Sequence, residues 1–365
     1  MGAPQGRHRE AVRRALSILL AVALLGGVAA AIYFGRESES GADTGTGLTE
    51  LRGVIGSEKR TLFDDPEFAR ALAKHGLTVT VDQAGSRRIA ELDLAGVDFA
   101  FPSSLPSAEK IQRTKNIQKS WSPFYSPMAV ATFTPVADVL EAQGLVRRDG
   151  TYRVLDVRAF VAAAGRQLRW NAIPNNTAYP ASQVVAITTT HPRDSNSAAM
   201  FAAVVSYVLN DQNVVRDQAQ LARVLERVVG LFLAQGYLET STEGPWESYL
   251  ATGLNFKPLV WVYEAQYVGR LLKGGVRPDS ELIYPSPTVL SKHTLVPLTD
   301  GGDRLGRLLT EDPELQRLAA KHGFRTTAFS AVVGEKAPDT VPNSVDPPAF
   351  EMQEAMLDEI ARRYK

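Results

Sequence analysis

The sequence predicts an α/β protein whose sheets are of the parallel type. Short β-branched apolar runs, such as 77–81 and 184–189, alternate with amphipathic segments of helical period. Polar, turn-prone residues follow most of these runs. Strands that alternate with helices indicate a sheet with crossover helices on its faces. The chain has 365 residues, a length sufficient for two lobes with their own cores. Its composition, 44% hydrophobic and 22% charged, is ordinary for a folded protein.

In the first half, each expected element rests on a local pattern. The run 52–58 is a short strand that ends in a Gly-Ser turn. The segment 62–75 has an apolar helical face, with acidic residues at its start and Gly76 after its end. Strands are expected again at 77–81, 96–104 and 128–134. Helices are expected at 89–94, at 135–144 after Pro135, and at the Ala-rich 157–167.

The second half is expected to open with a strand at 184–189, a polar loop and a helix that begins near Ser195. A long helix at 214–235 and a strand at 258–263 follow. Strand-like runs over 281–297 lead to a helix at 305–322, which ends before Gly323. The segment 334–348 is Pro-rich and extended, and 350–364 has the apolar spacing of a short terminal helix.

A pair of similar segments lies about 247 positions apart. Residues 65–76 and 312–323 both begin Asp-Pro-Glu and both end Lys-His-Gly. Shared helix start and stop signals explain the similarity, with an internal duplication as the alternative. His75 and His322 then lie at helix C-termini, where a partly charged imidazole suits the dipole, so we do not assign them as ligands.

Composition excludes several classes of function. The 40 basic and 40 acidic residues give zero net charge, so nothing indicates a nucleic-acid partner. The absence of cysteine excludes disulfides, thiolate metal sites and a cysteine nucleophile. The five histidines are scattered, and we predict no metal and no cofactor. Neither a Gly-x-Ser-x-Gly, a His-Glu-x-x-His nor a phosphate-binding Gly-rich motif is present, so we predict that the chain is not an enzyme.

The N-terminus predicts the compartment. Residues 1–14 are basic, and the run 15–34 has no charged residue. The length of this run is sufficient to span about 30 Å of hydrocarbon as a helix. We interpret these as a cytoplasmic segment and a transmembrane signal-anchor helix, followed by a flexible linker at 35–49. The chain would be a single-pass protein of the cell membrane with its main domain extracytoplasmic. The alternative is a cleaved signal peptide with Ala29-Ala30-Ala31 as its cleavage site.

Three stretches together resemble the type II periplasmic solute-binding family. They are 54–58, 187–197 and the helix with its Gly-Phe-Arg ending at 311–325. The chain is most similar to the oxyanion-type binders and to the binding domain of actinobacterial exported proteins linked to von Willebrand A domains. The resemblance implies a bilobal domain over 50–333, with lobe 1 at about 50–175 plus a C-terminal return and lobe 2 at about 184–300. The lipid-modified cysteine and the von Willebrand domain are missing, and the segment 334–365 is an addition.

In a binder of this kind, hydroxyl groups and backbone N–H groups at strand–loop–helix junctions would hold a small polar solute or oxyanion between the lobes. The residues that match these junctions are Ser57, Ser86, Thr190, Ser195, Asn196 and Ser197. Four further candidates have a less specific signal: Gly56, Arg193, Tyr263 and Glu264. Arg87, Arg88 and Arg193 would add charge-assisted donors if they face the cleft, but we favour their interpretation as solvated surface arginines.

The resemblance implies an extracytoplasmic substrate-binding protein, with an ABC-type permease as its partner. The membrane span and the added C-terminal segment leave a second function open. The same fold could serve as a membrane-tethered sensor or scaffold that binds a protein or another cell-envelope partner.

Overall fold

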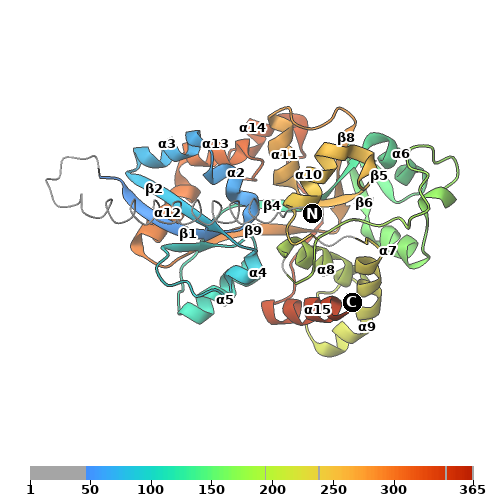
Figure 1. Ribbon diagram of the computed structural model, residues 1–365, viewed down its shortest axis with the longest axis horizontal. Helices are drawn as coiled ribbons and strands as arrows, with labels where there is room; N and C mark the ends of the chain where they lie inside the picture. Colours follow the sequence, from blue (N-terminus) through green and yellow to red (C-terminus); the bar gives the residue numbers. More distant parts are fainter. Residues whose placement is uncertain (1–46, 194, 237–238, 342, 364–365) are drawn as a thin grey trace, which may run out of the picture. The chain divides into compact units, whose positions relative to one another are not determined.

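The computed structural model describes residues 47–193, 195–236, 239–341 and 343–363 (Figure 1). The predicted cytoplasmic segment, the predicted membrane helix and most of the predicted linker lie outside these residues. Among the residues that are described, no helix is both long and apolar enough to cross a membrane. The first strand of the described chain begins at Thr49, the last residue of the segment predicted as a linker.

Ten strands of the described chain form one connected mixed sheet with the order β2-β1-β3-β9-β4-β8-β6-β5, to which β7 and β10 add beside β4 and β9. Their bounds are β1 Thr49–Ile55, β2 Leu77–Gln83, β3 Phe99–Phe101, β4 Trp121–Phe133, β5 Val146–Asp149, β6 Tyr152–Asp156, β7 Val260–Tyr263, β8 Ser280–Ser286, β9 Thr288–Pro297 and β10 Ser344–Val345. β1 pairs in parallel with β2 and β3, as predicted, but β4 is antiparallel to β7, β8 and β9. The sheet is therefore mixed rather than parallel throughout.

Helices cover the sheet on both sides. Those of the first half are α2 Arg60–Phe63, α3 Pro66–Lys74, α4 Ser86–Ile89, α5 Leu105–Lys115, α6 Thr134–Ala142 and α7 Val157–Gly165. Those of the second half are α8 Asn196–Leu209, α9 Gln218–Leu233, α10 Glu243–Thr252, α11 Glu264–Leu272, α12 Asp300–Glu311, α13 Pro313–Lys321, α14 Phe329–Val333 and α15 Phe350–Arg362.

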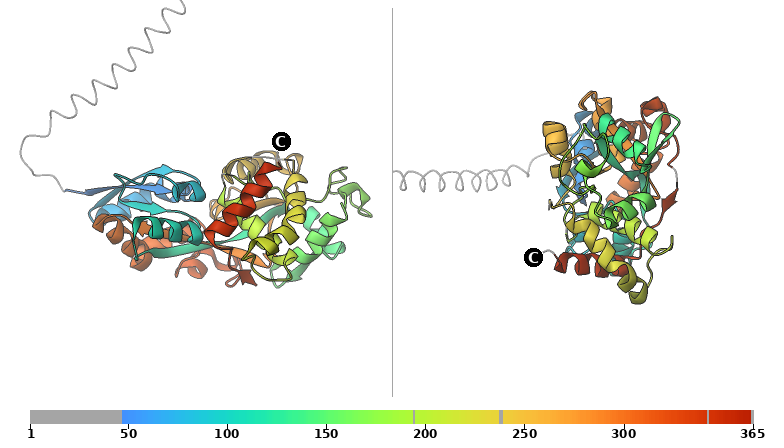
Figure 2. Two further views of the ribbon diagram at one scale, coloured as in Figure 1. Left: turned by 90° about the horizontal axis from the view of Figure 1, so that it is seen from below. Right: turned by 90° about the vertical axis from the view of Figure 1, so that its right-hand side faces the viewer.

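The described chain has two lobes joined by β4 and β9 (Figures 1 and 2). Lobe 1 contains β1–β3, α2–α5, α12 and α13, and its cores form around Phe68, Phe99 and Val54. Lobe 2 contains α6–α11 and β5–β8, and its core forms around α8. Phe160 and Trp170 belong to that second core, so residues 128–175 pack with lobe 2 and not with lobe 1 as predicted. The reason is that β4 carries the chain into lobe 2 before α6 begins.

The expected strand at 184–189 is present only as two isolated bridges, one between Val184 and Arg169 and one between Thr188 and Val260. Thr188 donates its N–H to Leu259 O at 2.9 Å and accepts from Trp261 N at 2.8 Å, and no longer ladder forms there. This segment is buried beside β7, and the β-branched run that predicted a strand is explained by burial. The helix that follows, α8, begins at Asn196 with Ser195 as its N-cap, as predicted.

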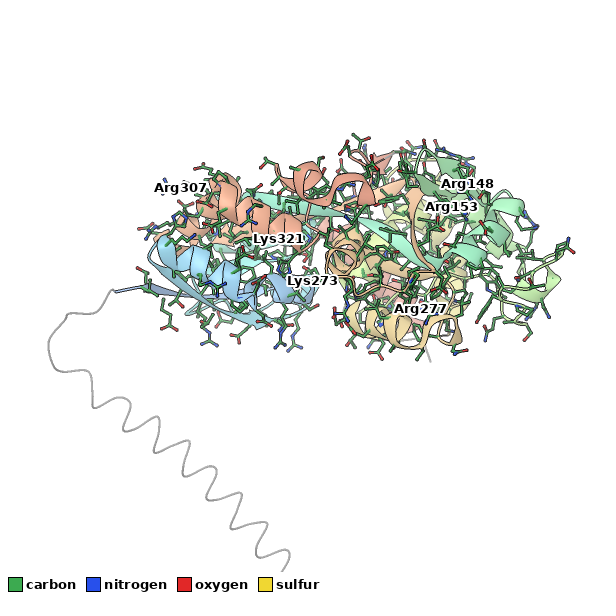
Figure 3. The ribbon with its side chains drawn as sticks, turned by 90° about the horizontal axis from the view of Figure 1, so that it is seen from above. Arg148, Arg153, Lys273, Arg277, Arg307 and Lys321 are labelled. Atoms are coloured by element: carbon green, nitrogen blue, oxygen red, sulfur yellow. The ribbon has the colours of Figure 1, made fainter. Side chains whose placement is uncertain are left out.

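The two similar segments of the sequence form a reciprocal helix pair in lobe 1. Asp65 Oδ2 lies 2.8 Å from His322 Nε2, and Asp312 Oδ2 lies 2.9 Å from His75 Nε2. Each contact joins the start of one helix to the end of the other, so α3 and α13 are antiparallel neighbours (Figure 1). Lys321, labelled in Figure 3, adds a 2.9 Å contact to Glu67.

Candidate functional site

A cleft of about 800 Å³ lies between the two lobes, and we call it the interlobe cleft. Lobe 1 supplies the end of β1, the loop after β2 and the helix α4. Lobe 2 supplies the start of α8, the loop before α10 and the end of β7. The lining residues are Ser57, Glu58, Gln83, Ala84, Gly85, Ser86, Arg87, Arg88, Glu91, Leu92, Arg193, Ser195, Asn196, Thr240, Ser241, Thr242, Tyr263 and, from α15, Glu354.

Most of the residues predicted to bind a ligand meet in this cleft. Six of them line it together, although they are up to 206 positions apart: Ser57, Ser86, Arg193, Ser195, Asn196 and Tyr263. Thr190 and Ser197 do not line it, because their side chains are completely buried behind the surface. Gly56 is also behind the lining, at a place where a Cβ would collide with Ser103 Oγ and with the carboxylate of Glu58.

Two of the predicted serines hold the backbone of the site. Ser86 Oγ accepts a hydrogen bond from Ser103 N at 2.8 Å, which ties α4 to the end of β3. Ser195 Oγ accepts from Ser197 N at 3.2 Å and so caps α8, which satisfies one free N–H group of the first turn. Because α8 starts at the cleft, its other N-terminal N–H groups and the positive end of its dipole lie close to any bound solute.

Asn196 and Tyr263 place an acceptor and a donor side by side. Asn196 Nδ2 donates to Ser103 O at 3.0 Å and to Tyr263 Oη at 3.1 Å. Asn196 Oδ1 is buried and has no hydrogen-bond partner within the described chain. Burial raises the pKa of Tyr263 well above its ordinary value, so the phenol keeps its proton and can donate it.

A buried charged cluster supports the lobe 1 wall, and the sequence did not indicate it. Lys59 is completely buried, and its Nζ lies 2.6 Å from Glu58 Oε1, 2.7 Å from Ser103 Oγ and 3.1 Å from His293 Nδ1. Burial lowers the pKa of Lys59, while the neighbouring Glu58 acts to raise it. Burial, and then the charge of Lys59, hold the pKa of His293 well below its usual range, so the imidazole is neutral and its Nδ1 accepts from Lys59. The cluster fixes Glu58 at the cleft surface.

Charges of both signs surround the cleft. Arg87, for which a solvated surface position was the favoured interpretation, is only 6% exposed. It forms a bidentate ion pair with Glu354 and also donates to Pro192 O. Arg88 and Arg193 are exposed cations on the lining, and Glu91 is an exposed anion there. The cleft therefore does not have the uniformly positive lining that would select anions by charge alone.

A smaller pocket of about 280 Å³ adjoins the interlobe cleft and shares Ser57, Glu58, Gln83 and Ser241 with it. Its far wall carries Glu243 and Glu247 of α10. Burial, followed by the charge of Glu247, raises the pKa of Glu243, which lines this pocket.

Glu264 does not line the cleft. It is completely buried, its Oε2 lies 2.6 Å from Arg325 Nε, and its Oε1 accepts from Tyr284 Oη at 2.6 Å. Arg325 also donates to Pro338 O at 2.6 Å and Asp339 O at 2.8 Å. Glu264, a candidate ligand residue, therefore forms a structural ion pair with Arg325. Arg325 in turn holds the C-terminal tail against the lobe junction.

No group of three or more His, Asp or Glu side chains in the described chain is placed to hold a metal ion. No protein-family model matches the sequence, and comparison with curated proteins also finds no match.

Solved structures of similar fold include periplasmic binding proteins. A periplasmic thiamin-binding protein matches with a TM-score of 0.56 at 10% identity, over 86% of this chain and 95% of that one. The periplasmic binding protein AfuA from Actinobacillus pleuropneumoniae, solved with exogenous fructose-6-phosphate, matches with a TM-score of 0.55 at 10% identity, over 86% of this chain and 97% of that one. At this identity the likeness establishes the two-lobe periplasmic-binding-protein fold.

Proposed function

We propose that this protein is an extracytoplasmic substrate-binding protein that captures a small polar solute in the interlobe cleft and delivers it to an ABC-type permease. One observation carries the proposal. Polar groups from both lobes line one cleft of about 800 Å³. They include Ser57 from lobe 1 and Asn196 and Tyr263 from lobe 2. A volume of this size suits a small-molecule ligand.

The chemistry of the lining favours recognition by neutral donors and acceptors. The N-terminus of α8 and the phenol of Tyr263 supply donors, and Asn196 Oδ1 supplies an acceptor without a protein partner in the described chain. Aligned N–H groups can hold an oxyanion without a counter-charge, so oxyanions are among the first solutes to test. The predicted span at 15–34 would anchor the protein in the cell membrane beside its permease.

A second candidate is a membrane-tethered sensor or scaffold that binds a protein or cell-envelope partner without transport. The helix α15 favours it, because this C-terminal addition contacts both lobes and supplies Glu354 to the cleft. A solute that binds the cleft and is also taken up by cells only when the gene is present supports transport. Binding without uptake supports sensing.

Thermal unfolding of the full-length chain in detergent tests the binding role. The solutes are sulfate, phosphate, molybdate, amino acids, sugars and sugar phosphates, each at saturating concentration. A ligand at one hundred times its Kd should add about 2.7 kcal/mol to the free energy of unfolding. Ser57→Ala removes a cleft hydroxyl and should abolish most of the shift, whereas Ser120→Ala, an exposed serine outside the cleft, should leave it unchanged. No shift with any solute argues against the proposal, and an equal shift in both variants refutes the site.

A further inference from the structure

We propose that the C-terminal helix α15 is a strap that holds the two lobes in the arrangement seen here, and that the Arg87–Glu354 ion pair locks it at the edge of the interlobe cleft. Figure 1 shows α15 beside α8 and α9, far from the tail's starting point at α14. The chain reaches this place by crossing the junction between the lobes. Arg325 holds the backbone at Pro338 and Asp339, and β10 then pairs in parallel with β9.

The helix begins with an apolar anchor in lobe 1. Phe350, its first residue, is 6% exposed and packs in the lobe 1 core with Val54, Ile89 and Ile111. Burial of an aromatic ring removes a large apolar surface from water, which stabilises this contact. Movement of α15 away from lobe 1 would have to expose this ring.

The remainder of the helix packs on lobe 2. Met356, Leu357 and Ile360 are each at most 1% exposed and belong to the core around α8. Gln353 Nε2 donates to Ala199 O in α8 at 3.3 Å, and Arg363 Nη2 lies 2.7 Å from Glu226 of α9. One rigid helix is therefore fixed at its start in lobe 1 and along its length in lobe 2.

The ion pair adds a directional link between the lobes. Arg87 of α4, in lobe 1, pairs with Glu354 through both carboxylate oxygens and donates to Pro192 O, in lobe 2. A bidentate guanidinium–carboxylate pair with little exposure is stronger and more specific in geometry than an exposed pair. The neighbouring Arg113–Glu351 pair also joins lobe 1 to α15, but its side chains are 54% and 64% exposed. It is therefore the matched control.

Separation of the lobes must break the Phe350 contacts or detach α15 from α8 and α9. Arg87 and Glu354 also line the cleft, so solute entry and the strap share the same residues. The strap therefore favours the arrangement of the lobes seen here even without solute, and this inference does not depend on the identity of the solute.

Distance measurement between spin labels tests the strap in the full-length chain. Because the sequence has no cysteine, Arg70→Cys in α3 and Ala162→Cys in α7 give two unique exposed labels, one on each lobe. We expect one narrow distance distribution in the labelled parent chain without solute. Phe350→Ala and Glu354→Gln, alone and together, should add a second population of different distance. Arg113→Gln should not.

Circular dichroism and the melting temperature of each variant show that it is folded. The conservative Glu354→Gln removes the charge but keeps a good helix former, so it tests the lock even if Phe350→Ala unfolds the chain. Identical distributions for the parent, Glu354→Gln and a folded Phe350→Ala would overturn the strap. A broad distribution in the parent would do the same.

Discussion

Lys59 is a charged side chain that the fold removes completely from water. Such a burial is stable only with a partner and further hydrogen bonds, which Glu58, Ser103 and His293 supply here. The neutral His293 accepts from Lys59, and the cluster holds Glu58 at the wall of the interlobe cleft. Glu58 therefore has two roles: it is the ion-pair partner of buried Lys59, and it lines the interlobe cleft.

His293 makes the stability depend on pH. Its pKa lies well below the usual value because of burial and the charge of Lys59, so between that pKa and about 6.5 the unfolded chain binds a proton that the folded chain does not. The stability that the neutral imidazole contributes is fully present well above pH 6.5 and is lost as the pH falls below it, with a limiting slope of about 1.4 kcal/mol per pH unit. Urea unfolding at pH 7.5 and pH 5.5 measures this loss. His293→Gln should lose less stability than wild type between these pH values. An equal loss would show that other groups cause it.

At this scale, local patterns predict caps and miss buried charges. Ser195 and Asn196 could be predicted, because a cap depends on residues within one helical turn. The burial of Lys59 could not be predicted, because its partners Ser103 and His293 lie 44 and 234 positions away. For the same reason, the sequence around Glu264, a less specific ligand candidate, does not show that this carboxylate is the partner of Arg325, 61 positions away.

At the scale of elements, the antiparallel pair of α3 and α13 explains the repeated sequence. In each helix the first Asp is the N-cap, and it also contacts the histidine that ends the other helix. One short motif therefore supplies both the start signal of a helix and the contact between two helices. The sequence predicted the helices and their ends but not their contact, because helix signals carry no information about the neighbour.

Asp312 allows the cap and the contact to be separated. Its Oδ1 accepts from Glu314 N and Leu315 N at 2.9 Å each, and its Oδ2 contacts His75. We expect Asp312→Ala to lower the free energy of unfolding by about 1 kcal/mol, since loss of a cap typically costs this much. Asp312→Asn keeps a good cap and should lose less. Asp300→Ala, an exposed acid beside the Thr299 cap of α12, should change stability by less than about 0.5 kcal/mol. Urea denaturation at pH 7.5 compares them, and an Asn variant as unstable as the Ala variant would contradict the capping role.

On the scale of the whole molecule, the sequence predicted the two-lobe fold but not the boundary between the lobes. The order of strands and helices, with the resemblance at 54–58 and 187–197, was sufficient for the architecture. The boundary depends on β4, which is antiparallel to three neighbours and passes from one lobe to the other. The apolar residues of β4 lie in both lobes, so the composition of this strand does not show where it passes from lobe 1 to lobe 2.

The shared strands also predict how the molecule unfolds. β4 supplies Phe124 to the lobe 1 core and Phe133 to the lobe 2 core, so neither core can melt without loss of ladder contacts to the other. We therefore expect one cooperative transition, even after Phe68→Ala removes a buried ring from lobe 1 at a cost of about 3–5 kcal/mol.

Two probes can test this cooperativity in the full-length chain. Three of the four tryptophans, Trp170, Trp246 and Trp261, belong to the lobe 2 core, so intrinsic fluorescence reports mainly on lobe 2, whereas far-ultraviolet circular dichroism reports on both lobes. In Phe68→Ala the two urea curves should coincide at a lower midpoint than in wild type. Phe201→Ala, in the lobe 2 core, should lower the midpoint in the same way for both probes. If dichroism is lost at lower urea than fluorescence in Phe68→Ala, the lobes unfold independently and β4 and β9 act only as a flexible connection.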